Sequence, residues 1–330
     1  MSTYREGVYD LGKGAFAYLQ DCNKGSGWGW SNSGLITDHE ESLLVDTLRD
    51  EKLTSAMLDA YRDAAGLLAR DIGTLVNTHR DADHTYGNRL MSHARILASE
   101  ACARQMRDRP PSAILAILKN RPPGVVGDYI FKLFGPPFEF EGIDPTLPTE
   151  TFKGRRDLKV GDKDVKLIEV GPAHTDGDVL VYVPANRTVF TGDIVFLTNT
   201  PVIWAGPHEN WVAALDLILA MEVDIVVPGH GPITDKKGVA KVKEYIAHVE
   251  RESRARYDAG LTVEEAIQDI ALGEFDDWGG AERIVPNVLY FYRRFRGEPF
   301  HDNLREALKM MAPLALRGRK VRATCAPVLG

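Results

Sequence analysis

The chain has 330 residues, of which 44% are hydrophobic and 26% charged, and its formal net charge is -7. These proportions predict a packed globular enzyme, and the negative charge argues against binding to nucleic acid. No apolar run approaches the roughly 20 residues that a membrane-spanning helix needs, and the first residues carry no secretory signal pattern. Three widely spaced cysteines do not suggest a disulfide scaffold. We therefore expect a cytoplasmic protein with neither a nucleic-acid nor a membrane partner.

The first part of the chain is predicted to be rich in β-structure. Residues 7–50 contain alternating or continuous apolar runs separated by glycine and asparagine turns. Between two of these runs lies the segment KGSGWGWSNSG. We expect it to form a mobile hairpin with exposed aromatic groups, in which Trp28, Trp30 and Asn32 could contact the substrate. The alternative is that the two tryptophans cover a core.

The next elements alternate between helix and strand until a proline-rich segment begins. Residues 54–70 have the apolar spacing of an amphipathic helix, and residues 72–76 predict a strand. Residues 88–109 predict a further strand and helix. Residues 110–150 contain many prolines and several short apolar pieces, which indicates an insertion with short helices. Such an insertion would suit a lid or a contact between two subunits.

Strand patterns return at residue 156 and give way to helical patterns after residue 235. Two sheets packed face to face, with helices outside, would fit this order of elements. We expect residues 1–235 to form a metal-binding catalytic domain. Residues 236–330 are expected to form a helical C-terminal extension that packs on the same domain.

Four separate segments, each after a predicted strand, carry side chains that commonly bind metals. They contain His79, Asp81, Asp83 and His84 in the first segment, then His174, then Asp193, and then His230. Glycine and proline near these residues allow tight turns at strand ends. Imidazole suits zinc, iron and nickel, whereas a carboxylate can bridge two metals. The recurrence, more than any single histidine, predicts a metal site.

The order of these motifs over roughly residues 10–235 resembles the metallo-β-lactamase superfamily, whose first motif is usually H-x-H-x-D-H. The resemblance implies an α+β fold, an αββα four-layer sandwich with the metal site at one edge between the sheets. It also implies a ligand set: His79, residue 81 and His174 for one metal, and Asp83, His84 and His230 for a second, with Asp193 bridging. The segment LLVDT matches an early strand of the family and implies that Asp46 supports the ligands.

Asp81 departs from the family pattern, because most members have histidine there. It could ligate the first metal, it could be too short to reach and leave one metal in place, or the site could have lost catalysis. We favour ligation, because aspartate is a competent ligand and the other ligands are retained. The additional carboxylate would make the bound water less acidic and would favour harder metals such as iron and manganese.

The resemblance implies a metallohydrolase that uses a metal-bound hydroxide, with Asp83 and Asp81 as catalytic carboxylates. The expected cofactors are two divalent metal ions, zinc first, with iron or manganese as alternatives. The hairpin and the insertion would form an apolar roof, which favours a small apolar or aromatic substrate of the ester, thioester or lactone class. Tyr86 and His208 are further candidates for substrate contact.

Three other functions remain open at this point. The layout of the chain is similar to that of hydrolytic chlorothalonil dehalogenases, which implies hydrolytic dehalogenation of an activated aromatic ring. A di-iron, oxygen-dependent enzyme would suit the additional carboxylate at Asp81. A non-catalytic metal-binding protein is the third alternative. The apolar insertion and the tail could also form a homodimer interface.

Overall fold

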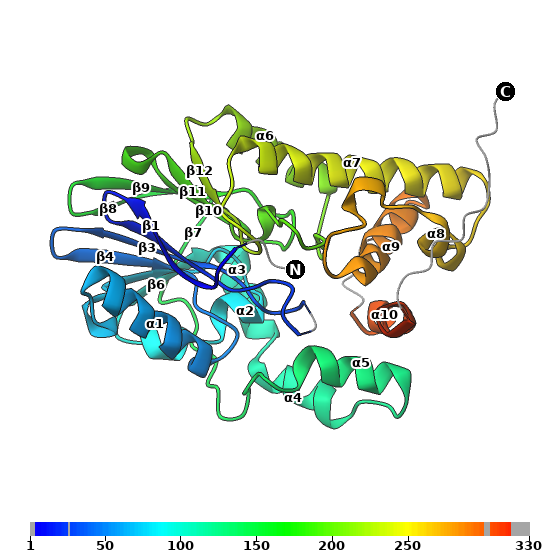
Figure 1. The fold of residues 1–330 in the computed structure, drawn as a ribbon, viewed down its shortest axis with the longest axis horizontal. Coiled ribbons are helices and arrows are strands. Elements are labelled where there is room, and N and C mark those ends of the chain that lie inside the picture. The colour runs from blue at the N-terminus through cyan, green and yellow to red at the C-terminus, as the bar shows by residue number, and fades with distance from the viewer. Residues whose placement is uncertain (1–3, 26, 300–303, 318–330) are drawn as a thin grey trace.

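Two mixed β-sheets lie face to face in this computed structural model, which describes residues 4–25, 27–299 and 304–317 (Figure 1). The strands of the first sheet are, in spatial order, β1 (Gly7–Gly12), β2 (Ala15–Leu19), β3 (Ser33–Asp38), β4 (Glu41–Val45), β5 (Thr74–Val76), β6 (Arg95–Ser99) and β7 (Glu150–Phe152). The strands of the second sheet are β12 (Ile225–Val227), β11 (Thr188–Phe190), β10 (Val179–Val183), β9 (Lys163–Glu169) and β8 (Arg155–Val160).

The facing surfaces of the two sheets form an apolar layer. Leu43 and Val45 of β4 belong to the same buried cluster as Val181 of β10 and Phe190 of β11. The sheets approach closely at Gly34 of β3, where an added Cβ would overlap the Phe190 ring. This contact explains a glycine in the interior of a strand, a position that glycine otherwise weakens.

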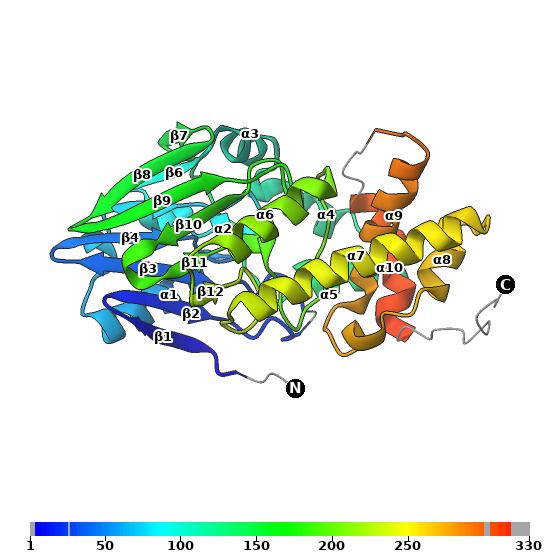
Figure 2. The ribbon, with the colours of Figure 1, turned by 90° about the horizontal axis from the view of Figure 1, so that it is seen from above.

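Helices cover the outer faces of both sheets, so the predicted αββα sandwich is confirmed (Figures 1 and 2). The helices are α1 (Glu51–Ala65), α2 (Ala82–Thr85), α3 (Glu100–Asp108), α4 (Pro111–Lys119), α5 (Val125–Phe134), α6 (His208–Ala220), α7 (Lys236–Asp258), α8 (Val263–Asp269), α9 (Ile284–Phe295) and α10 (Leu304–Arg317). The helix predicted for residues 54–70 is α1. Its ends differ because the Asp50 carboxylate caps the first turn by accepting from the Leu53 N–H at 2.7 Å, and Gly66 ends the helix in the left-handed region.

The insertion and the C-terminal helices lie together at the end of the sandwich away from β1–β4 (Figure 2). One buried cluster contains Leu133 of α5, Trp211 of α6, Tyr245 of α7 and Phe291 of α9. The tail therefore shares a hydrophobic core with residues that precede it in the chain. The division at residue 235 stays a prediction.

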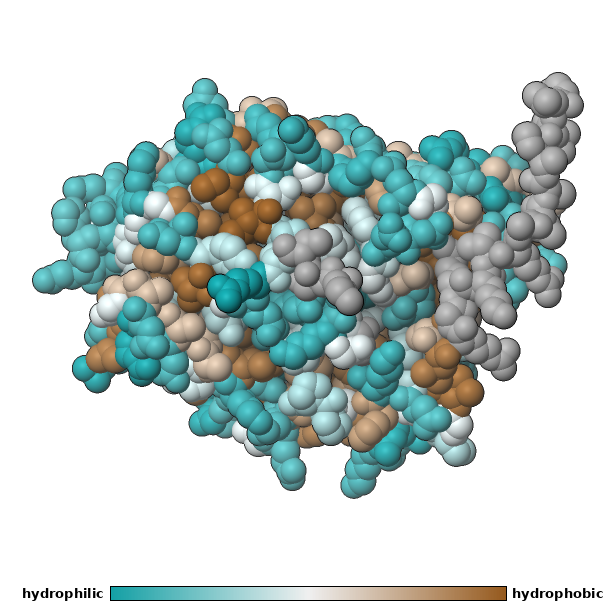
Figure 3. Space-filling view, viewed as in Figure 1, coloured by the Kyte–Doolittle hydropathy of each residue, from teal (hydrophilic) through white to brown (hydrophobic). Residues whose placement is uncertain are grey.

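On the face shown in Figure 3, hydrophilic side chains cover most of the surface, with smaller apolar groups between them. Large hydrophobic side chains that are exposed include Val125, Phe131, Leu217 and Leu316. Among the described residues, none of the helices has the length and apolar character needed to cross a membrane.

Candidate metal centre

The four ligand segments meet at one edge of the sandwich because of how the strands run. β11 and β12 are parallel, so Asp193 and His230, which follow them, emerge at the same edge. β10 is antiparallel to β11, so the loop that precedes β10 brings His174 to this edge as well. β5 of the other sheet ends here, and the turn into the short helix α2 presents the first motif.

The first group of ligand-type atoms belongs to His79, Asp81, His174 and Asp193, which lie within 4.8 Å of one another. The Asp81 Oδ2 atom is 3.2 Å from His174 Nε2 and 3.8 Å from His79 Nε2. The Asp193 Oδ2 atom is 3.4 Å from His174 Nε2 and 3.6 Å from His79 Nε2. Two imidazole nitrogens and two carboxylates are thus brought around one small volume, as a metal ligand set requires.

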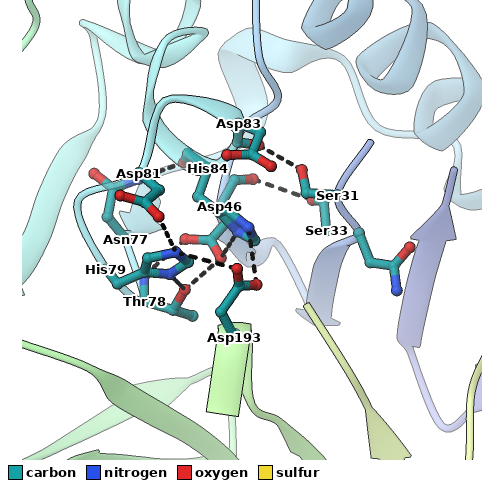
Figure 4. Close-up of polar contacts among 12 residues, drawn as sticks. Ser31, Ser33, Asp46, Asn77, Thr78, His79, Asp81, Asp83, His84 and Asp193 are labelled. Carbon is teal, nitrogen blue, oxygen red and sulfur yellow. Dashed lines mark hydrogen bonds and ion pairs between the residues drawn. The ribbon is translucent and has the colours of Figure 1, made fainter. Parts of the chain in front are cut away.

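A second group consists of Asp83, His84 and His230, whose ligand-type atoms also lie within 4.8 Å of one another. His230 Nε2 is 3.4 Å from Asp83 Oδ2 and 3.3 Å from Asp193 Oδ2. The Asp193 Oδ1 atom is 3.2 Å from His84 Nε2. The Asp193 carboxylate therefore touches both groups, and Figure 4 shows it facing His79 and His84 from the opposite sheet. This position suits a carboxylate shared by two metal ions.

Bound metal ions would account for buried polar atoms that have no hydrogen-bond partner in this site. His79 Nε2, His84 Nε2 and Asp193 Oδ1 are buried and have no hydrogen-bond partner. Buried polar atoms are rarely left in this state, because the lost hydration costs free energy. All three atoms point into the same small volume, so divalent cations bound there would satisfy them together.

Asp46, in the turn after β4, fixes the orientation of two parts of the site. Its Oδ2 atom lies 2.9 Å from His84 Nδ1 and accepts from the Thr78 hydroxyl at 2.6 Å. Its Oδ1 atom accepts from the Thr78 N–H at 2.7 Å. A carboxylate on the far nitrogen of an imidazole leaves Nε2 as the metal-binding atom and makes it more basic. Backbone carbonyls do the same for two other histidines: Val202 for His174 at 2.7 Å and Trp30 for His230 at 2.9 Å.

His79 and His84 have different pKa values because their neighbours differ. Burial, together with the nearby His84, lowers the pKa of His79 well below its usual value, so that ring stays neutral. Burial also opposes charge on His84, but the Asp193 and Asp46 carboxylates outweigh it and raise the His84 pKa. The same carboxylates that favour a proton on His84 would favour a cation bound there, so metal and proton would compete for this site.

Asp81 lies at the start of α2, and Arg80 and His174 stabilise its ionised form. Burial opposes its ionisation, but Arg80 and the hydrogen bond with His174 outweigh burial and lower the pKa of the Asp81 carboxyl below its usual range. Arg80 Nη1 is 3.0 Å from Asp81 Oδ1, which leaves Oδ2 directed at the histidines. The carboxylate is therefore ionised and within reach of the first group, as a ligand must be.

A cavity of about 460 Å³ opens over the two groups. Its wall includes Asp81, Asp83, His174, Asp193 and His230, so the ligands form its floor. Apolar and aromatic side chains supply much of the remaining wall, among them Trp28, Ile114, Ile117, Phe134, Phe196 and Trp204. Insertion, hairpin and tail all contribute, since Leu304 and Arg305 of α10 also line the cavity.

Two of the residues expected to contact substrate line this cavity. Trp28 is held in place from three sides: its Nε1 donates to Glu282 at 3.3 Å, Arg283 stacks on its ring, and Trp204 packs against it. Burial raises the pKa of Tyr86 to about 12, so its phenol stays protonated and can donate a hydrogen bond.

The other three residues lie outside the cavity wall. Trp30 is buried and holds His230 through its carbonyl, whereas Asn32 donates to the Pro228 and Gly231 carbonyls beside that ligand. His208 begins α6 and packs against Tyr290 and Phe291. These two residues belong to the tail, which follows all the candidate metal ligands in the sequence. A contact between His208 and the substrate stays a prediction.

Sequence reasoning missed Arg49 and Arg283, which both line the cavity. Arg49 follows Asp46 by three residues, so an arginine close in sequence to the aspartate that supports the candidate ligands was the available signal. Arg283 comes from the tail, and nothing in its local sequence points to the cavity.

Residues 26–230 match the family model of the metallo-beta-lactamase superfamily. The linear primary-alkylsulfatase of Pseudomonas sp. (strain ATCC 19151) is 26% identical over 205 residues, which are 55% of this chain and 39% of that protein. The structure of the inverting sec-alkylsulfatase Pisa1 from Pseudomonas sp. matches with a TM-score of 0.66 at 16% identity, over 91% of this chain and 51% of that chain. A metallo-beta-lactamase from Pontibacter korlensis matches with a TM-score of 0.53 at 17% identity, over 72% and 98% of the two chains.

The chain belongs to the metallo-β-lactamase superfamily, as the family model and the order of the ligand segments together establish. It has the fold of the hydrolytic enzymes of that superfamily. It spans well under half the length of the alkylsulfatase to which it is similar in sequence.

Proposed function

We propose that the protein is a metal-dependent hydrolase that binds two divalent metal ions and cleaves a small organic substrate with an apolar part. The observation that carries this proposal is the shared carboxylate of Asp193, which joins two ligand groups on the floor of a largely apolar cavity. Zinc is the first candidate metal, since four of the seven residues offer imidazole nitrogens. The Asp81 carboxylate makes iron and manganese the alternatives.

One metal would be held by His79, Asp81 and His174, and the other by Asp83, His84 and His230, with Asp193 between them. When bound, such a pair supplies Lewis acidity and makes a water ligand nucleophilic near neutral pH. The side chains of the protein would bind and orient the substrate and would handle protons.

Asp83 and Asp81 are the proposed catalytic carboxylates at the cavity floor, and Asp81 would be available for proton transfer only if it does not bind a metal. The Asp83 main-chain carbonyl accepts a hydrogen bond from the Ser31 hydroxyl, which ties the start of α2 to the hairpin and fixes where its side chain points (Figure 4). The apolar part of the wall, with Phe196 stacked on His230 at 5.0 Å, would lower the polarity around the reacting bond. Electrostatic interactions on the floor are stronger in a less polar environment.

The substrate class that we propose first is an ester, thioester or lactone with an apolar or aromatic group. An alkyl sulfate ester is the second candidate, favoured by the likeness to an alkylsulfatase in sequence and by arginines in the cavity wall. Aromatic dehalogenation, a di-iron oxygen-dependent reaction and a non-catalytic role remain alternatives. A cytoplasmic location and a homodimer remain predictions.

The test is hydrolysis by the full chain, stripped of metal with a chelator and reloaded in turn with Zn, Fe or Mn. The substrates are a p-nitrophenyl acyl ester and a medium-chain alkyl sulfate, each with and without dioxygen. We expect turnover that returns with metal and does not require dioxygen. Turnover that needs dioxygen would instead support the di-iron alternative, and fully loaded protein that cleaves neither substrate would contradict the proposal.

A further inference from the structure

Arg49 is a buried cation beside the metal ligands. It lies between β4 and α1 and is only 3% exposed. Its guanidinium carbon is 4.6 Å from the centre of the Phe138 ring, 5.5 Å from Phe134 and 5.7 Å from Phe140. The insertion therefore surrounds this charge with aromatic rings, and the guanidinium reaches the cavity wall between them.

Arg49 has hydrogen-bonding capacity that the protein does not use. Its Nε and Nη2 atoms are buried without a partner, and no ion pair to it occurs within residues 4–25, 27–299 and 304–317. Two other arginines in the cavity wall are already bound: Arg80 to Asp81 at 3.0 Å, and Arg283 to the Thr200 carbonyl at 3.2 Å. A guanidinium stays charged in proteins, so leaving it buried and unpaired is costly unless something else binds it.

The carboxylates near Arg49 are committed elsewhere. Burial lowers the pKa of Arg49, and the Asp83 and Asp81 carboxylates oppose that fall. Both belong to the metal-binding groups, and divalent ions would neutralise them. With metals bound, the region around Arg49 is therefore short of negative charge.

The tryptophan hairpin holds Arg49 in this position. Gly29 has a positive φ of +77°, and a Cβ on it would overlap the Arg49 guanidinium. The hairpin backbone thus lies directly on the guanidinium and limits its movement. Because the Arg49 guanidinium is already held in place, an anionic ligand that binds it would lose less conformational entropy on binding.

We propose that Arg49 binds an anionic group of the substrate, so that the cavity takes an organic anion with an apolar tail. This inference rests on the proposed function, because it names the substrate class of the same site. The planar fork of Arg49 suits two oxygens of a sulfate, sulfonate or carboxylate group. Ile114, Ile117 and Trp204 provide the apolar wall that would receive the tail.

The test is direct binding to the metal-loaded full chain, measured by calorimetry. The probe is 1-octanesulfonate, which has no bond that a hydrolase can cleave, and the neutral probe is 1-octanol. Arg49→Met removes the charge and keeps an apolar side chain of similar length, Arg49→Lys keeps the charge without the fork, and Arg62→Met is the control at an exposed arginine of α1. Octanoate in place of octanesulfonate separates a carboxylate from a sulfonate or sulfate preference.

We expect Arg49→Met to weaken octanesulfonate binding by about tenfold or more, as for the loss of a charged hydrogen bond, and to leave octanol binding unchanged. Arg49→Lys should fall between Arg49→Met and the wild type. Arg49→Met should also unfold at no lower temperature than the wild type, because it removes an unpaired buried charge. A purely structural role on the phenylalanine rings would instead lower that temperature.

Equal octanesulfonate affinity in the wild type and Arg49→Met would overturn the inference, as would an equal loss for octanol. If Arg49→Met does not fold, Arg49→Lys decides, since wild-type affinity in that variant would also count against a recognising fork. The outcome is independent of turnover. A protein that binds octanesulfonate through Arg49 yet hydrolyses nothing would contradict the proposed function and leave this inference standing.

Discussion

Asp81 adds a carboxylate to the group formed by His79, His174 and Asp193, and its role can be measured through metal content. We expect Asp81→Ala to lower the metal content from about two ions per chain to about one, because the first group loses a charged ligand. The measurement is elemental analysis of protein from cells grown with balanced Zn, Fe and Mn.

Asp162→Ala is the matched control for that experiment. Asp162, Asp38 and His39 form another group that brings ligand-type atoms together. It lies at the C-terminal end of β3. The loss of Asp162 should leave the metal content unchanged. The same stoichiometry in Asp81→Ala and the wild type would mean that Asp81 is not a ligand and is free for proton transfer.

Asp46 touches no reacting group, so its effect should appear in metal affinity. Asp46→Asn keeps the shape but loses the charge that orients His84, and the metal affinity should fall about 10–100-fold. Competition with a chromophoric chelator measures this. Asp50→Asn, at the N-cap of α1, changes another buried aspartate in the same loop and should leave metal affinity as it is. A parallel fall in both variants would show that the loop, and not the contact with His84, is responsible.

At the scale of the elements, the packing of β3 on β11 depends on Gly34. Gly34→Ala should destabilise the fold by about 1–3 kcal/mol, because its Cβ would overlap the Phe190 ring between the sheets. Gly73→Ala is the control: it precedes β5, and its Cβ would meet nothing within 4 Å. Its effect should stay within about 0.5 kcal/mol. Chemical denaturation compares the two, and a similar loss for both would mean that the sheets can separate to accept the methyl group.

The elements also show why the clustering of the candidate metal ligands could be predicted from the sequence and the positions of other cavity residues could not. His79, His174, Asp193 and His230 each follow or precede an apolar strand, so local sequence carries both their position and their chemistry. Arg49 acquires its role only through contacts with Phe138 of the insertion and with the hairpin, which are distant in sequence. The contact of His208 with Tyr290 of the tail could not be read from the local sequence for the same reason.

At the scale of the whole molecule, one hydrophobic cluster includes residues from the sandwich and from the tail. We therefore expect a single cooperative unfolding transition whose midpoint rises with metal concentration, because metal binds the native site. Differential scanning calorimetry tests this by comparing the calorimetric enthalpy with the van't Hoff enthalpy. Two separate transitions, with only one sensitive to metal, would show that residues 236–330 unfold independently.

The Glu282 carboxylate accepts hydrogen bonds from Trp28 of the hairpin and, at 3.1 Å, from Tyr129 of the insertion. Three segments that are far apart in the sequence thus share one acceptor, next to Trp28 of the cavity wall. A substitution that displaces one of these segments would therefore disturb its hydrogen bond through Glu282 to the others. A library meant to redirect the enzyme to new substrates should therefore vary the hairpin, the insertion and the tail together, since changes confined to one of them would be opposed by the two that remain.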